Sequence, residues 1–394
     1  MGWNSWNAFR GNINEQQIKD IADVMVSSGM KDAGYEYIVL DDNWMANPAR
    51  DGEGYLIADP VRFPSGIKAL ADYIHSKGLK LGIYGDRGTM TCMDIPESGS
   101  YGYEEQDAKT FASWGVDYLK YDNCNPARNS NQARDYRRMQ EALANSGRPI
   151  VFSICAWGFQ SWMPEVGNLW RTTGDIVDRW DNGDDWFVGI INAIDQNQRY
   201  ASHAKPGAWN DPDMLEIGNG GCTTEEYKTQ FSMWSMMAAP LMAGNDLRNM
   251  TEVTLEILTN TEVIAVNQDP LGKQCVKVRT DGDEEVYVKP LSNGDYAVVL
   301  LNRGETETEM RVTATEIGFS DIPEHGYLVR DLWEHNEFGS LGSITATVAT
   351  HGVAMFRVSQ VAIDELPGYL DISTTFDDLL SSEEAFNFTT TLDN

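Results

Sequence analysis

Basic residues are scarce in this chain. Its 394 residues include 30 Lys and Arg against 60 Asp and Glu, which gives a formal net charge of −30 at pH 7. Binding to nucleic acids or to anionic membranes depends on Lys and Arg, so the charge argues against both partners. No apolar run approaches the roughly 20 residues that a membrane-spanning helix needs. These absences favour a soluble protein that acts on an uncharged molecule.

Cysteine is also rare. The five cysteines are Cys92, Cys124, Cys155, Cys222 and Cys275. An odd number does not make a disulfide scaffold, although one bridge can still form. No secretory leader is recognisable at Met1, but a bridge and an acidic surface favour a secreted or extracellular protein. The sequence predicts no particular oligomeric state.

Short β-type runs alternate with helical runs over residues 1–270. The predicted strands are Tyr35–Leu40, Leu79–Tyr84, Val116–Tyr121, Pro149–Ile154, Leu169–Thr173, Gly207–Trp209, Ala238–Met242 and Val263–Val266. The predicted helices are Glu15–Ser28, Ile67–Lys77, Glu105–Trp114, Gln132–Asn145, Trp186–Arg199, Thr224–Met236 and Thr251–Leu258. We expect Gly2–Trp6 to follow a first strand, in which case one of the weaker later strands drops out.

This alternation indicates a parallel sheet covered by helices. Seven or eight strand–helix units favour an α/β fold of the closed (β/α)8 type, a TIM barrel. An open doubly wound sheet is the alternative, but no Gly-x-Gly-x-x-Gly motif follows a strand to support a dinucleotide site.

The pattern changes after residue 270. Strand-like segments follow at Cys275–Arg279, Glu285–Pro290, Asp295–Asn302, Glu309–Val312, Gly326–Asp331, Ser343–Val348 and Val353–Val358. With turns and no clear helices between them, they predict an antiparallel β-sandwich over residues 271–360. Residues 361–394 hold eight acids and no Lys or Arg, which indicates an acidic tail or linker.

Carboxylates follow most strands of the predicted barrel. They are Asp41, Asp42, Asp86, Asp122, Asp175, Asp211, Asp213 and Asp246. The carboxyl ends of all barrel strands meet at one face, where active sites lie. A single acid there is often a helix cap, but acids converging from six strands would repel one another if nothing used them. The pattern therefore predicts a functional site.

Two kinds of chemistry fit a ring of carboxylates: metal binding and glycoside hydrolysis. Catalytic zinc sites usually include histidine, and none of the five histidines ends a barrel strand. A carboxylate-only magnesium site is the remaining metal alternative. Aromatic residues near the acids favour a sugar, and they are Trp3, Trp6, Trp44, Tyr84, Trp157, Trp170 and Trp209. We therefore expect a carbohydrate substrate, with no metal and no cofactor.

The strand that ends at Asp122 carries the most information. Side chains alternate along a strand, so Tyr118, Lys120 and Asp122 share one face. Lys120 should favour the ionised form of Asp122, which is the form that a covalent glycosidase nucleophile needs. An ordinary surface ion pair is the alternative interpretation of this segment alone.

With these acids in place, the chain resembles glycoside hydrolase family 27, the α-galactosidase and α-N-acetylgalactosaminidase family. The resemblance covers residues 1 to about 274. Its motifs, in order, are MGWNSWN (1–7), YIVLDDNW (37–44), LGIYGDRGTMTC (81–92), GVDYLKYDNC (115–124), CAW (155–157), RTTGDI (171–176), WNDPDML (209–215), MAAPLMAGNDLR (237–248) and VNQDPLGKQ (266–274). The family also implies a β-domain after the barrel.

The resemblance assigns roles to individual residues. It implies Asp122 as the nucleophile and Asp175 as the acid/base of a retaining hydrolysis, with carboxyl groups about 5–5.5 Å apart. It places the sugar against Trp3, Asp41, Asp42, Asp86, Lys120, Cys155, Trp157, Arg171, Asp213 and Met214. It also implies a disulfide bond between Cys92 and Cys124 at the rim of the site, where two free thiols are the alternative.

The sequence departs from the family pattern in places that bear on specificity. A second family disulfide is lost, because its two cysteine positions are Asn43 and a residue near Gly11. Ala156 is small, as in N-acetylgalactosaminidases, whereas Phe159 is large. Asp86 leaves room for the hydroxymethyl group of galactose, where β-L-arabinopyranosidases carry Glu.

These features favour α-galactosidase activity. The enzymatic alternatives are α-N-acetylgalactosaminidase, β-L-arabinopyranosidase and a carboxylate-only metal hydrolase. A galactose-binding lectin-like relative is the non-enzymatic alternative.

Overall fold

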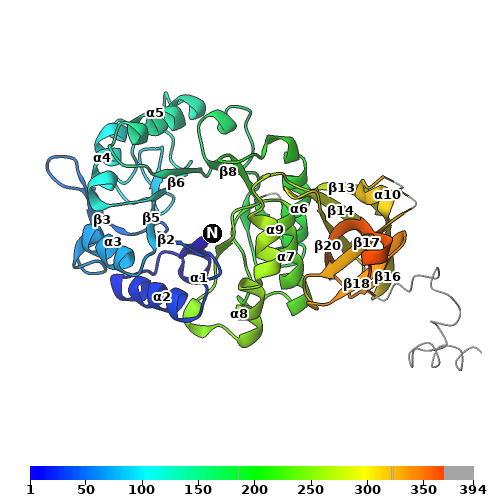
Figure 1. The fold of residues 1–394 in the computed structure, drawn as a ribbon. Coiled ribbons are helices and arrows are strands. Elements are labelled where there is room, and N and C mark those ends of the chain that lie inside the picture. Colours follow the sequence, from blue (N-terminus) through cyan, green and yellow to red (C-terminus); the bar gives the residue numbers. More distant parts are fainter. Residues whose placement is uncertain (185, 321, 323, 368–394) are drawn as a thin grey trace, which may run out of the picture.

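The computed structural model describes residues 1–184, 186–320, 322 and 324–367. Two domains lie side by side, an N-terminal one from blue to green and a C-terminal one from yellow to red (Figure 1). Most of the predicted acidic tail, residues 368–394, lies outside the described residues.

The N-terminal domain contains eight parallel strands in the order β11-β8-β7-β6-β5-β2-β1-β12. Their bounds are β1 Gly2–Asn4, β2 Tyr37–Leu40, β5 Lys80–Asp86, β6 Tyr118–Asp122, β7 Val151–Ile154, β8 Leu169–Arg171, β11 Trp209–Asp211 and β12 Met242–Ala243. The sheet closes through Leu215, whose backbone N–H donates to Met242 O at 2.8 Å. The predicted barrel is confirmed.

Two strand predictions were wrong. Gly2–Asn4 does not follow a first strand but is that strand, and it pairs with β2 and β12. Val263–Val266 lies in a helix, α9 (Thr261–Asn267). The side chain of Asn260 caps this helix by accepting the backbone N–H groups of Glu262 and Val263, both at 3.1 Å. Four apolar residues cannot by themselves distinguish a strand from a turn of buried helix.

Helices surround the barrel (Figure 1). Their bounds are α1 Trp6–Phe9, α2 Glu15–Ser27, α3 Gly66–Ser76, α4 Glu104–Trp114, α5 Gln132–Ala144, α6 Ile190–Gln198, α7 Thr224–Met236 and α8 Glu252–Leu258. Short 3-10 turns lie at Met163–Glu165, Ala201–His203, Leu247–Asn249 and Ile363–Glu365. No helix in the described part of the chain is both long enough and apolar enough to cross a membrane.

The helix predicted from Trp186 begins later than expected, at Ile190. Phe187–Val188 (β10) instead pairs in parallel with Asp175–Ile176 (β9). The Asp184 carboxylate accepts the backbone N–H groups of Trp186 and Phe187 at 2.6 and 3.1 Å. An aspartate that binds amides just ahead of it favours a turn over a helix. A hairpin of β3 (Met45–Arg50) and β4 (Leu56–Ala58) was also not predicted.

The C-terminal domain is the predicted antiparallel β-sandwich. One sheet has the order β13-β14-β15-β20-β17-β18, and the other pairs β16 with β19. The bounds are β13 Val276–Asp281, β14 Glu284–Pro290, β15 Tyr296–Asn302, β16 Thr308–Thr313, β17 His325–Asp331, β18 Glu337–Ser340, β19 Ser343–Val348 and β20 Val353–Ala362. Strand β18 and the one-turn helix α10 (Ala314–Ile317) were not predicted.

Helix α7 joins the two domains. It packs against β14, β15 and β20, and Phe231 and Trp234 on it are fully buried. Lys289 of β14 is also fully buried, and its ammonium donates to Ser235 O at 3.0 Å and to Val266 O at 2.7 Å. These carbonyls lie in the last turns of α7 and α9, where few intrahelical donors remain, and Ser235 O also accepts the backbone N–H of Ala238 at 3.2 Å. Burial lowers the pKa of Lys289 to about 8.

Substitution of Lys289 by Met should weaken the folded state. We expect Lys289→Met to reduce the free energy of unfolding by about 1–3 kcal/mol, because the buried Val266 carbonyl loses the donor that Lys289 supplies. Urea denaturation measures the loss. Lys273→Met, at an exposed position, is the control and should change stability by less than about 0.5 kcal/mol. Equal stability of both variants would show that the Lys289 hydrogen bonds do not hold the two domains together.

Candidate active site

A polar pocket lies at the carboxyl ends of the barrel strands. Its empty space is about 440 Å³, counting the open mouth. It is lined by Trp6, Asn7, Asp41, Asp42, Tyr84, Cys92, Lys120, Asp122, Trp157, Arg171, Asp175, Asp213 and Met214. A larger hollow of about 1510 Å³, lined by Tyr37, Asp117 and Arg148 among others, lies elsewhere on the barrel. We take the smaller pocket as the site because it gathers five carboxylates at the face where barrel active sites lie.

Asp122 is a buried carboxylate at the end of β6. Its Oδ2 accepts a hydrogen bond from the Tyr84 hydroxyl at 2.9 Å. Burial raises the pKa of Asp122 to about 6, against the opposing charge of Lys120 and the Tyr84 hydrogen bond. The charge of Asp175 also raises it. Lys120 therefore favours the ionised form of Asp122, as expected, but burial has the larger effect.

Lys120 is bonded to a different acid from the one the strand pattern suggested. Its Nζ lies 2.7 Å from Asp41 Oδ2. The same Asp41 oxygen accepts a hydrogen bond from Asn4 Nδ2 at 2.8 Å. Asp42, next in the chain, accepts the backbone N–H of Met93 at 3.0 Å. Burial and the adjacent Asp41 charge raise the pKa of Asp42 to about 7, opposed by hydrogen bonds from backbone amides.

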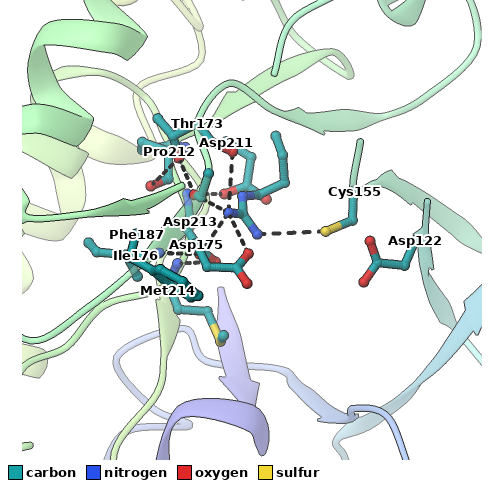
Figure 2. Close-up of polar contacts among 12 residues, drawn as sticks. Asp122, Cys155, Thr173, Asp175, Ile176, Phe187, Asp211, Pro212, Asp213 and Met214 are labelled. Atoms are coloured by element: carbon teal, nitrogen blue, oxygen red, sulfur yellow. Dashed lines mark hydrogen bonds and ion pairs between the residues drawn. The ribbon is translucent and has the colours of Figure 1, made fainter. Parts of the chain in front are cut away.

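Arg171, at the end of β8, binds two acids. Its Nη2 lies 2.9 Å from the buried Asp213 and 3.2 Å from Asp175, whose side chain is 45% exposed. Arg171 also donates to the Gly174 carbonyl. The Asp175 and Asp122 carboxylates point toward each other across the pocket (Figure 2). One of these two acids is therefore buried, while the other is joined to a cation and open to solvent.

Asp213 accepts hydrogen bonds at both carboxylate oxygens and at its backbone carbonyl. Its Oδ2 accepts the backbone N–H of Ile176, and its Oδ1 that of Met214, each at 2.9 Å. Its own carbonyl accepts the indole N–H of Trp234 at 2.8 Å. Asp213 therefore fixes Arg171 and the strand that carries Asp175.

Other predicted residues lie behind the lining of the pocket. Asp86 is fully buried and accepts the backbone N–H groups of Gly88 and Cys124 at 2.6 and 2.8 Å. Burial and the charge of Asp122 hold the pKa of Asp86 well above its usual range. Trp3 is fully buried, and its indole donates to Asn245 O at 2.7 Å. Cys155 is buried with its sulfur 3.6 Å from Arg171 Nη1.

The predicted disulfide bond between Cys92 and Cys124 is confirmed. It ties the loop after β5 to the end of β6, and its Cys92 side lines the pocket. The sulfur atoms of these two cysteines and carboxylate oxygens of Asp86 and Asp122 lie within 4.8 Å of one another, close enough to hold a metal ion. Because both sulfurs are in the bridge, only two carboxylates of that group remain as ligands.

Asp246 does not join the other acids. It caps the turn at Leu247–Asn249 and binds Arg248 at 2.7 Å. Conversely, the strand-end pattern missed Asn7 and Glu216. Asn7 lines the pocket and donates to the buried Glu216, and burial raises the pKa of Glu216 to about 8. Glu216 follows the Leu215 bridge rather than a regular strand, so the pattern did not mark it.

Comparisons with known proteins identify the family of the chain. Residues 1–269 match the family model described as alpha galactosidase A, and residues 281–358 match that of the alpha galactosidase C-terminal beta sandwich domain. The chain belongs to the α-galactosidase family. It is a glycosidase of that family, glycoside hydrolase family 27, and its substrate is a carbohydrate.

Several relatives match almost the whole chain. Alpha-galactosidase 2 of Arabidopsis thaliana is 52% identical over 366 residues, covering 91% of this chain and 89% of the relative. Alpha-galactosidase A of Cellvibrio japonicus is 46% identical over 374 residues, covering 91% of each. The structure of α-galactosidase I from Mortierella vinacea has a TM-score of 0.87 at 39% identity, covering 92% of this chain and 97% of that one.

Asp213 and Asp175 both bind Arg171, but their replacement should change the stability of this α-galactosidase by different amounts. Asp213→Asn should lower the free energy of unfolding by about 3–5 kcal/mol, because it leaves a buried guanidinium without its main partner. Asp175→Asn, the matched control at the half-exposed acid, should cost less than about 1 kcal/mol. Chemical denaturation compares the variants. Equal losses would contradict a structural role confined to Asp213.

Proposed function

We propose that this protein releases terminal α-linked galactose from oligosaccharides or polysaccharides by a retaining double displacement. Asp122 is the nucleophile and Asp175 the acid/base. The observation that carries the proposal is the pair itself: two carboxylates that face each other across one pocket in different surroundings. A nucleophile and an acid/base need such different surroundings.

In the first step, a carboxylate oxygen of Asp122 attacks the anomeric carbon. The bond from that carbon to the glycosidic oxygen breaks, and Asp175 gives its proton to the leaving oxygen. In the second step, Asp175 takes a proton from water, and the water oxygen attacks the anomeric carbon and displaces Asp122. Two inversions give net retention. Arg171, 3.2 Å from Asp175, stabilises the carboxylate that forms when Asp175 loses its proton.

The remaining polar groups fit recognition of the sugar hydroxyls. Asp41 and Asp42 accept hydrogen bonds from the 4- and 6-hydroxyls in this proposal, while Lys120 donates from the same wall. Asp86 supports the site from behind, since its oxygens are taken by backbone amides.

The 2-position of the sugar decides between galactose and N-acetylgalactosamine. Phe159 stacks on Tyr200 with ring centroids 4.6 Å apart and lies close to His203, so its bulk is taken up by that cluster. In this proposal Trp157, which lines the pocket, bounds the 2-position with Cys155 behind it, as the family resemblance implies, and this favours galactose. A panel of aryl α-galactoside, α-N-acetylgalactosaminide and β-L-arabinopyranoside tests this preference.

Replacement of Asp122 and replacement of Asp175 should both slow turnover, but for different reasons. Asp122→Asn should lower kcat/KM on an aryl α-galactoside by at least about 10⁴-fold, because no covalent intermediate forms. Asp175→Ala should lower kcat/KM about 10²–10⁴-fold, and added azide should restore turnover by attacking the covalent intermediate, with α-galactosyl azide as the product. NMR of the azide adduct checks the stereochemistry.

Three results would contradict this proposal. Substantial hydrolysis by Asp122→Asn would remove Asp122 from its role. No turnover by the wild-type protein, with galactose still bound, would favour a lectin-like relative. Loss of activity on chelation would favour a carboxylate-only metal hydrolase.

The pH dependence should report on Asp122. Its pKa is raised to about 6, and only the ionised form attacks, so kcat/KM of the wild-type protein should fall as pH falls through about 6. Tyr84→Phe removes a hydrogen bond to the ionised form and should move this limb about one pH unit higher. Tyr121→Phe, on the other face of the same strand β6, is the control. An unmoved acid limb in Tyr84→Phe would contradict the assignment.

A further inference from the structure

A large indole is exposed beside the pocket. The side chain of Trp186 is 65% exposed, and its ring centroid lies 5.9 Å from that of Trp157 in an edge-on arrangement. Trp157 lines the pocket itself. The two rings therefore continue the aromatic wall of the pocket toward the solvent.

Hydrogen bonds hold the backbone of Trp186 next to the proposed acid/base. The Trp186 carbonyl accepts the backbone N–H of Asp175 at 2.7 Å, and Asp184 holds the Trp186 amide from the other side at 2.6 Å. Trp157 has a φ of 55°, a conformation that bulky residues rarely adopt. Such a conformation persists only where the surrounding structure holds it.

The position next to Asp175 identifies the side of the substrate that Trp186 faces. An acid that protonates the glycosidic oxygen has to lie within hydrogen-bond reach of it, so a residue bound to Asp175 lies on the leaving-group side. The pocket is small, because its empty space is about 440 Å³ even when the open mouth is counted. We take it to hold one sugar ring, with the rest of the substrate outside.

We propose that Trp186, with the edge of Trp157, forms a subsite for the first leaving sugar, a neutral pyranose. The apolar C–H face of a pyranose can stack on the exposed indole, which adds a polar N–H at its edge. The formal net charge of −30 disfavours an anionic leaving group. This subsite rests on the proposed function, because Asp175 defines its orientation.

Two substrates with the same galactosyl group separate this subsite from catalysis. One is the disaccharide galactosyl-α-1,6-glucose, and the other is α-galactosyl fluoride, which has no leaving sugar. We expect Trp186→Ala to lower kcat/KM for the disaccharide about tenfold and to change kcat/KM for the fluoride less than twofold. Trp186→Phe should retain most of the disaccharide activity, because it keeps an aromatic face.

The control is Phe187→Ala. Phe187 is the next residue and is also exposed, at 53%, but successive side chains of an extended segment point to opposite sides. Its removal should leave the ratio of the two kcat/KM values unchanged. Equal losses on both substrates in Trp186→Ala, or no loss on the disaccharide, would overturn the subsite alone. Failure of the wild-type protein to hydrolyse the fluoride would overturn the proposed function, and the subsite with it.

Discussion

Repulsion among carboxylates is the constraint on which the rest of the site depends. The barrel brings five aspartates to one pocket, whose described lining includes two cations, Lys120 and Arg171. Each cation binds one buried acid closely: Lys120 binds Asp41 at 2.7 Å and Arg171 binds Asp213 at 2.9 Å. Two of the remaining acids are Asp122, which is buried against a tyrosine hydroxyl, and Asp175, which is half exposed. Pairing of the cations with Asp41 and Asp213 therefore leaves three carboxylates, of which Asp42 accepts a backbone amide, while Asp122 and Asp175 face each other across the pocket.

The β-sandwich contributes to this arrangement from a distance. Lys289 of the sandwich binds the last turns of α7 and α9. Trp234 of α7 donates its indole N–H to the carbonyl of Asp213, and Asp213 in turn holds Arg171 beside Asp175. A continuous series of contacts thus joins the second domain to the Asp175 side of the pocket. This gives a physical reason for the two domains to occur together, since the sandwich supports the helix on which Asp213 rests.

The sequence predicted those features that follow from a local period or a repeated position. Strand alternation located Asp122, and the repetition of acids after strands located Asp41, Asp42, Asp175 and Asp213. Contacts between distant segments could not be predicted in this way. Lys120 was expected beside Asp122, two residues away, but it binds Asp41, which is 79 residues away in the chain. The same limit explains Asp246, which has the right position after a strand, yet binds Arg248 in its own turn.

The segment between β9 and α6 shows why strand ends and loops carry different parts of specificity. The strand ends hold the acids around one pocket, and their positions are fixed by the barrel hydrogen bonds. The part of the β9–α6 segment from Trp186 onward was predicted as helix, but its backbone is held by Asp184 and by pairing with Asp175. Loops of this kind can change without disturbing the barrel. If the proposed subsite holds, binding of the galactosyl group and binding of the leaving group can vary separately, because rigid strands carry the acids and an adjoining loop carries Trp186.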